Sequence, residues 1–151
     1  MVEIKTCCVT GHRSIPLGEI STITQKLKQE VLLAIRDGYT HFISGFALGA
    51  DLLFADIIVK MKKFYPITLE AAIPYPGRMR TLDQKFQSLI ACCDTVKIHS
   101  DHYFKGCYMY RNRYMVDQSQ RIIAVYDGRK TGGTIATLRY AQKKEIHIVW
   151  S

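Results

Sequence analysis

Three glycine-marked turns are the feature of this sequence most able to do chemistry. They occupy residues 10–13, 44–51 and 127–134, and each follows an apolar run that is typical of a buried strand. Glycine lets the backbone come close to a ligand, and the N–H groups at the start of a helix bind anions. If the three runs are parallel strands, their carboxyl ends share one edge of a sheet, where ligands bind. The sequence therefore predicts one phosphate-holding crevice built from distant segments.

The first turn offers Gly11 for a close backbone approach and Arg13, whose planar guanidinium suits phosphate. An ordinary strand-to-loop turn with an exposed arginine is the alternative. The glycine fingerprint GxGxxG is absent, which argues against an ordinary dinucleotide dehydrogenase.

In the second turn, Gly45 and Gly49 would leave backbone N–H groups open at the start of a helix. Asp51 would lie in the first turn of that helix, where it would cap the helix or accept hydrogen bonds from ribose hydroxyls. In the third turn, Gly132 and Gly133 remove side chains where the backbone would meet a phosphate.

Three further residues fall near the same edge. Thr134 could cap the last helix and donate to a phosphate oxygen, and Tyr75 could stack on a base or belong to a rigid loop. Arg111 could reach over the crevice from the helix before the fifth strand, or belong to a solvated helix face. No catalytic residue, metal site or bound cofactor is predicted. The predicted ligand-binding residues are Gly11, His12, Arg13, Ser44, Gly45, Gly49, Ala50, Asp51, Tyr75, Arg111, Asn112, Asp127, Gly132, Gly133 and Thr134.

The elements that must position these residues alternate along the chain. Apolar runs predict strands, and apolar residues at helical spacing predict helices between them. Such an order calls for a mostly parallel sheet with helices on both faces. We expect a single doubly wound, Rossmann-like α/β domain over residues 1–151. The expected strands are 3–10, 41–44, 68–73, 95–99, 121–126 and 146–150, and the expected helices are 19–37, 49–63, 82–91, 110–118 and 133–143.

The formal charge of +8 on 151 residues favours an anionic partner, either a nucleotide-like small molecule or a nucleic acid. The basic residues are spread out and form no continuous stripe, so nucleic acid is not favoured. No apolar run is long enough for a membrane helix, and residues 1–5 lack a signal-peptide core. We expect a cytoplasmic protein without a membrane partner, with five free thiols, and a homo-oligomer such as a homodimer.

The motifs at residues 10–13, 44–51, 111–117 and 131–134 together resemble the SLOG superfamily, and within it the YpsA-like group. The resemblance extends over nearly the whole chain. It implies a Rossmann-like fold and a site for a nucleotide or a nucleotide-derived ligand. The superfamily includes the LOG phosphoribohydrolases, the DNA-processing protein Smf, and sensor domains of bacterial conflict and signalling systems.

The chain departs from the LOG pattern Pro-Gly-Gly-x-Gly-Thr-x-x-Glu. Aligning Gly132 and Gly133 on its paired glycines places Arg139 where the glutamate is expected. A carboxylate there would stabilise the positive charge that builds on the sugar, and an arginine would not. The sequence therefore favours a sensor or sequestering module, for an ADP-ribose-like ligand for example. A phosphoribohydrolase is the first alternative. Single-stranded nucleic-acid binding, with bases stacked on Tyr108, Tyr110 and Tyr114, is the second.

Overall fold

The computed structural model describes residues 3–150 and contains one six-stranded sheet in the order β4-β3-β2-β1-β5-β6. Every neighbouring pair of strands is parallel, so the expected mostly parallel α/β sheet is confirmed and is parallel throughout. The strands are β1 (Lys5–Gly11), β2 (Tyr39–Ser44), β3 (Thr68–Ile73), β4 (Thr95–Ile98), β5 (Arg121–Val125) and β6 (Glu145–Val149). The helices are α1 (Leu17–Arg36), α2 (Ala50–Met61), the 3-10 helix η1 (Pro76–Arg80), α3 (Gln84–Ile90), α4 (Cys107–Gln118) and α5 (Gly133–Tyr140).

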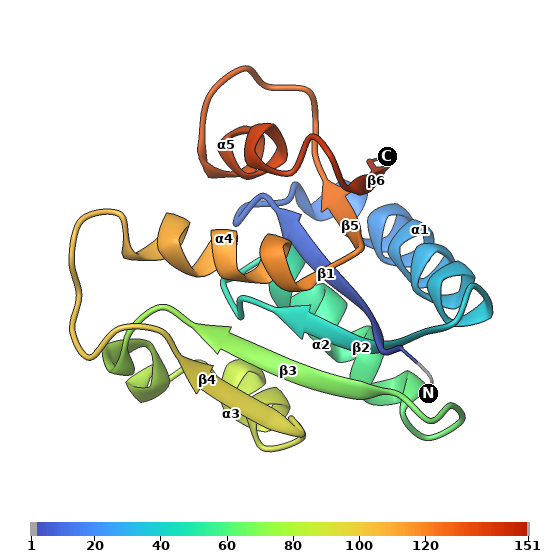
Figure 1. Cartoon of the computed structure of the whole chain (residues 1–151), viewed down its shortest axis with the longest axis horizontal. Coiled ribbons are helices and arrows are strands. Elements are labelled where there is room, and N and C mark those ends of the chain that lie inside the picture. The colour runs from blue at the N-terminus through green and yellow to red at the C-terminus, as the bar shows by residue number, and fades with distance from the viewer. Residues whose placement is uncertain (1–2, 151) are drawn as a thin grey trace.

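Helices cover both faces of the sheet. Helices α1, α2 and α3 pack on one face, and α4 and α5 lie together on the other (Figure 1). The larger core lies under the first group and includes Phe42, Phe54 and Leu69, all fully buried. A smaller core, including Met115 and Ile122, lies under the second group. Strand β5 is buried at every position, as expected for a strand covered on both faces.

Two elements near the site differ from the sequence prediction. Helix α4 begins at Cys107 rather than at residue 110, because Gly106 precedes it with a φ of 93° and ends the loop there. Arg111 consequently lies one turn inside the helix instead of at its start. The segment after β3, expected as a loop, forms the 3-10 helix η1, with Pro76 in its first turn.

The strand order places a topological switch point between β1 and β5. Strands β1 to β4 are added in one direction across the sheet, whereas β5 pairs with the opposite side of β1. The connections after β1 and after β5 therefore leave the sheet toward opposite faces. They open a crevice at the carboxyl ends of these two strands, which is the usual ligand position in such sheets. The last residues of the two strands, Gly11 and Val125, lie side by side in the register.

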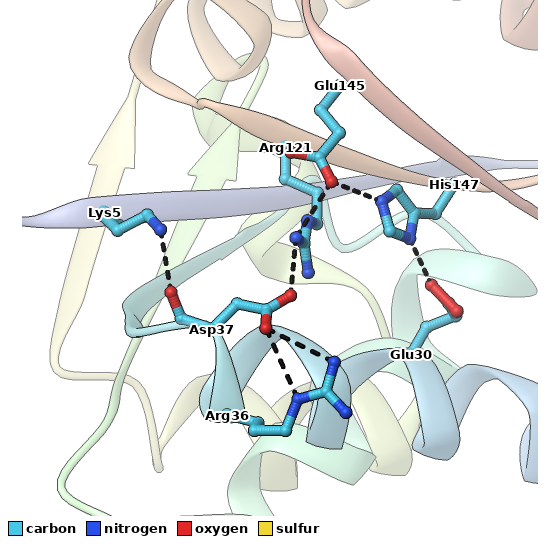
Figure 2. A network of polar contacts seen from close by, with 7 residues as sticks. All are labelled: Lys5, Glu30, Arg36, Asp37, Arg121, Glu145 and His147. Atoms are coloured by element: carbon cyan, nitrogen blue, oxygen red, sulfur yellow. Dashed lines mark hydrogen bonds and ion pairs between the residues drawn. The ribbon is translucent and has the colours of Figure 1, made fainter.

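Ion pairs join the elements at the amino-terminal ends of strands β5 and β6, which lie opposite the crevice. Figure 2 shows Arg121 at the start of β5, with Nη2 2.8 Å from Asp37 Oδ2 and 2.9 Å from Glu145 Oε1. His147 of β6 continues this network, with Nε2 2.7 Å from Glu145 Oε1 and Nδ1 2.6 Å from Glu30 Oε1 (Figure 2). The network joins β5 and β6 to α1 at the end of the sheet remote from the crevice.

The five cysteines carry free thiols. Within residues 3–150, no helix combines the length and the apolar character that a membrane span requires.

Candidate functional site

A cavity of about 600 Å³ opens at the carboxyl edge of the sheet, beside the switch point. Its size is typical of small-molecule sites. The three predicted turns contribute to its wall, and α4 supplies the rest. The lining residues that matter most for binding are Gly11, His12, Arg13, Asp51, Tyr108, Arg111, Asn112, Arg129, Gly132, Gly133 and Thr134.

Three arginines make the cavity electropositive. The guanidinium carbon of Arg13 lies 4.6 Å from the ring centroid of Tyr108, and that of Arg111 lies 5.7 Å from the same ring. Arg129 lines the cavity from the third turn, and Asp51 is the one acidic residue among the described residues that line it. Because Arg129 is ion-paired with Asp127, the positive charge in excess of Asp51 comes from Arg13 and Arg111, and it suits a phosphorylated ligand.

Hydrogen bonds hold the side chain of Arg111 in place. Although its side chain is charged, the residue is only 3% exposed. Its Nη1 donates to the carbonyl oxygens of Gly45 (2.6 Å) and Ala72 (2.8 Å), and its Nε donates to Oδ1 of Asn112 (2.8 Å). These bonds hold the guanidinium at the cavity wall. Among the described residues, the hydrogen bonds of the Arg111 side chain use Nε and Nη1, and Nη2 makes none.

Asp51 is a buried carboxyl group beside that arginine. Its Oδ2 accepts a hydrogen bond from the backbone N–H of Ala47 (3.2 Å). It does not cap α2, which was one of the two roles that the sequence left open. Burial raises the pKa of Asp51 to about 6, against the opposing attraction of Arg111 and Arg13. The group therefore exchanges a proton near neutral pH, as carboxyl groups that act in binding or catalysis often do.

The start of α5 faces the cavity with bare backbone. Gly132 is the N-cap residue, with a φ of 111°, and no side chain caps the helix. A Cβ atom built at Gly132 or Gly133 would meet no protein atom within 4 Å. Thr134 does not cap the helix, contrary to the sequence prediction, and its Oγ1 lies 3.4 Å from Nδ1 of His12 instead. The first residues of α5 thus line the cavity, and the first N–H groups of this helix have no side-chain cap.

His12 links the first turn to the third. Its Nε2 lies 3.1 Å from Oδ1 of Asp127 and 3.2 Å from the backbone nitrogen of the same residue. Nε2 can donate to the carboxylate or accept from the N–H, but it cannot do both at once. Burial lowers the pKa of His12, although Asp127 opposes this, which favours the neutral ring. In the Nδ1–H tautomer of that ring, Nε2 accepts from the N–H of Asp127. The ring also packs against Trp150, with centroids 5.6 Å apart.

The structure brings most of the predicted site residues to this cavity, and it places a few beneath or beside it. Ser44 is fully buried and donates to the carbonyl oxygen of Asp51. Asp127 is paired with Arg129, which holds the pKa of that carboxyl well below its ordinary value. Tyr75 lies behind Tyr108, with ring centroids 6.2 Å apart. The predicted residues that do not line the cavity are Ser44, Gly45, Gly49, Ala50, Tyr75 and Asp127.

The second turn works differently from the sequence prediction. The N–H of Ala50, the first residue of α2, donates to the carbonyl oxygen of His12 (3.1 Å), so it is not open to an anion. A Cβ atom at Gly49 would lie 2.5 Å from the carbonyl oxygens of His12 and Arg13. Gly45 leaves room for two side chains, because its Cβ atom would lie 2.7 Å from Nη1 of Arg111 and 2.8 Å from Oδ2 of Asp51. Gly45 and Gly49 therefore allow Arg111, Asp51 and the β1–α1 connection to pack closely together.

Sequence reasoning left Tyr108, Arg129 and Thr131 out of the ligand-binding set, although all three line the cavity. Tyr108 had been considered only as a stacking residue for nucleic acid. It lies in the first turn of α4, and the late start predicted for that helix concealed its place. Arg129 and Thr131 belong to the third turn itself, so their position within that segment was the available signal.

Comparison with solved structures finds the same fold in proteins of low sequence identity. DNA processing protein A from Helicobacter pylori, described by its single-stranded DNA binding mode, matches with a TM-score of 0.69 and 17% identity. The match covers 95% of this chain and 64% of that one. The structure of TM1055 matches with a TM-score of 0.58 and 12% identity, over 95% of this chain and 72% of that one.

Sequence relatives cover most of the chain. A UPF0398 protein of Halalkalibacterium halodurans is 24% identical over 156 residues, which cover 94% of this chain and 82% of the relative. The SPbeta prophage-derived protein YoqJ of Bacillus subtilis is 30% identical over 148 residues, which cover 83% of this chain and 86% of the relative. The family model YpsA matches residues 7–148, which include all three glycine-marked turns and helix α4. The chain therefore belongs to the YspA SLOG family.

Proposed function

We propose that this protein binds a nucleotide or a nucleotide-derived ligand through its phosphate groups, and acts as a sensor or a sequestering module. The observation that carries the proposal is the meeting, in one cavity, of three arginines with the uncapped start of α5. Guanidinium groups and helix N-termini both bind phosphate. Membership of the SLOG family is consistent with such a ligand.

In this proposal the phosphate lies between Arg13, Nη2 of Arg111 and the first N–H groups of α5. The ring of Tyr108, which both guanidinium groups approach, offers a face for the sugar or the base. Asp51 is placed at the wall of the cavity, where its carboxyl group can accept hydrogen bonds from ribose hydroxyls.

Calorimetric titration of the folded protein with AMP, ADP-ribose and cyclic nucleotides tests this proposal. We expect saturable binding by at least one of them. The Arg13→Ala variant should bind about ten- to a hundredfold more weakly, because it loses charge-assisted hydrogen bonds. Arg113→Ala is the matched control, since Arg113 is exposed on α4 and its guanidinium carbon lies 5.1 Å from the ring of Tyr140, outside the cavity. Absence of saturable binding by the whole panel would refute the proposal.

A hydrolase that cleaves an N-glycosidic bond is a second candidate, and Asp51 is the observation that favours it. It is a buried carboxyl group with a pKa of about 6 in an arginine-rich cavity, which suits proton transfer near pH 7. The test is chromatographic detection of free base after incubation with nucleoside monophosphates, with wild type and Asp51→Asn compared. Release by the wild type alone would support this activity, and no release would leave the binding role.

Single-stranded nucleic acid is less well supported. The aromatic contacts among Tyr75, Tyr103 and Tyr108 offer stacking surfaces beside the arginines, but the arginines line one cavity of about 600 Å³ rather than an extended basic stripe. Binding of an oligonucleotide that weakens steeply with salt would favour this reading. Self-association also stays a prediction, which light scattering during gel filtration measures.

A further inference from the structure

A second cavity, of about 440 Å³, adjoins the first. Arg13 and Ser14 of the β1–α1 connection line both cavities, and both residues are exposed to solvent. From this shared rim, the first cavity extends toward α4 and α5, and the second extends between α1, α2 and α3. A ligand held by Arg13 therefore lies at the entrance to both.

The two cavities differ in chemistry. Where arginines line the first, the second is lined by aliphatic side chains of the β1–α1 connection, α1 and α2. Apart from Arg13 at the shared rim, the charged residues in its wall are Asp56 and Lys85, which form an ion pair of 2.8 Å. The second cavity thus offers a surface for an uncharged group. Its aliphatic residues are Ile15, Ile20, Leu52 and Leu53.

The β1–α1 connection lies directly against the start of α2. Gly49 lines the second cavity, and the carbonyl oxygens of His12 and Arg13 press against it. Any side chain there would push the β1–α1 connection away from α2, since its Cβ atom would lie 2.5 Å from both oxygens. Glycine therefore keeps this connection low over the start of α2.

We propose that the ligand crosses the β1–α1 connection and occupies both cavities. This inference rests on the proposed function, and it names the ligand class: a nucleotide whose phosphate carries a second, uncharged apolar group. An apolar fragment gains little by binding alone, because association costs translational and rotational freedom. Joined to a phosphate that the arginines already hold, the same fragment binds as an intramolecular step.

Calorimetry with three probes tests the proposal. AMP fills the first cavity only, whereas diadenosine diphosphate adds a planar group and octanoyl-AMP adds an aliphatic one. We expect at least one extended probe to bind about tenfold or more tightly than AMP. The identity of that probe distinguishes a second nucleoside from an acyl chain.

Two variants fill the second cavity from different helices, so that failure of one to fold leaves the other. Ile20→Trp on α1 and Leu53→Trp on α2 should each abolish the gain of the extended probe while changing AMP affinity by less than about twofold. Leu17→Trp is the matched control, because Leu17 is 89% exposed on the same helix as Ile20 and lines neither cavity. This variant should keep the gain.

Equal binding of AMP and both extended probes would overturn the inference and leave the proposed function intact. Persistence of the gain in both tryptophan variants would also overturn it, since the added group would then lie elsewhere. Failure of all three probes to bind would count against the proposed function itself.

Discussion

Replacing Asp51 by asparagine should make the protein more stable at neutral pH. The folded protein raises the pKa of this carboxyl group from 3.8 to about 6, because burial disfavours its charged form more than Arg111 and Arg13 favour it. Asp51 is 8% exposed, so solvent screens this effect little. At one pKa unit per 1.36 kcal/mol, ionisation of the folded protein costs about 3 kcal/mol.

The sign follows from proton linkage. The folded state binds the proton of Asp51 more tightly than the unfolded state does, so the free energy of unfolding decreases as pH rises from 3.8 to about 6. Above that pH the cost is constant. Asparagine carries no charge, and its amide oxygen can still accept the hydrogen bond from Ala47. The variant should match wild type near pH 4 and exceed it by up to about 3 kcal/mol at pH 7.

Urea unfolding at several pH values between 4 and 8 measures this difference. Trp150, the one tryptophan in the chain, gives the fluorescence signal. Asp101→Asn is the control, because the Asp101 side chain is 92% exposed and its replacement should change little. Equal stability of Asp51→Asn and wild type at every pH would refute the conclusion that burial disfavours the charged form of Asp51 in the folded protein.

Three further predictions concern residues that hold the site and the sheet. Gly11→Ala should destabilise the fold by about 1–3 kcal/mol through overpacking, because the added Cβ atom would lie 2.4 Å from the Cβ atom of Ala50. Gly18→Ala is the control, because a Cβ atom there would meet nothing within 4 Å, and it should be neutral or stabilising in the same urea experiment. Arg111→Lys should cost about 1–3 kcal/mol, because the single ammonium nitrogen of lysine cannot replace both Nε and Nη1 and leaves one of their acceptors unpaired. A thermal melt that matches wild type would contradict this. His147 has a raised pKa because Glu145 and Glu30 outweigh its burial, so its stabilising contribution is present below pH 6.5 and is lost as pH rises through the folded-state pKa. His147→Gln should therefore be less stable than wild type at pH 6 and approach it at pH 9, as urea midpoints would report.

Much of the site could be predicted from local pattern. Arg13 closely follows one apolar strand, and Gly132 and Gly133 lie in the turn after another. Parallel strands bring their carboxyl ends to one edge whatever their order. The same pattern placed Asp51 in the first turn of a helix, where the structure has it. These predictions needed only the identity of the segments and the parallel direction of the sheet.

The roles of individual groups could not be predicted in the same way. The sequence suggested open N–H groups at Gly45 and Gly49, but the structure uses these glycines to pack Arg111, Asp51 and the β1–α1 connection closely together. Thr134 was expected to cap α5 and instead lies against His12, which is more than a hundred residues away in the chain. Such contacts depend on how segments that are distant in the chain pack against each other, and the local sequence does not encode this packing.

The sequence alone determined the alternation of strands and helices, the parallel sheet and the segments that end at its carboxyl edge, because periodicity and glycine placement are properties of neighbouring residues. Only the tertiary structure decided that β5 pairs with β1 and so places the crevice between the first and third turns. It also decided that the backbone carbonyl groups of Gly45 and Ala72 accept hydrogen bonds from Arg111 and hold its side chain at the cavity. Strand order and buried hydrogen bonding arise from long-range packing, and the charge and volume of the cavity follow from them.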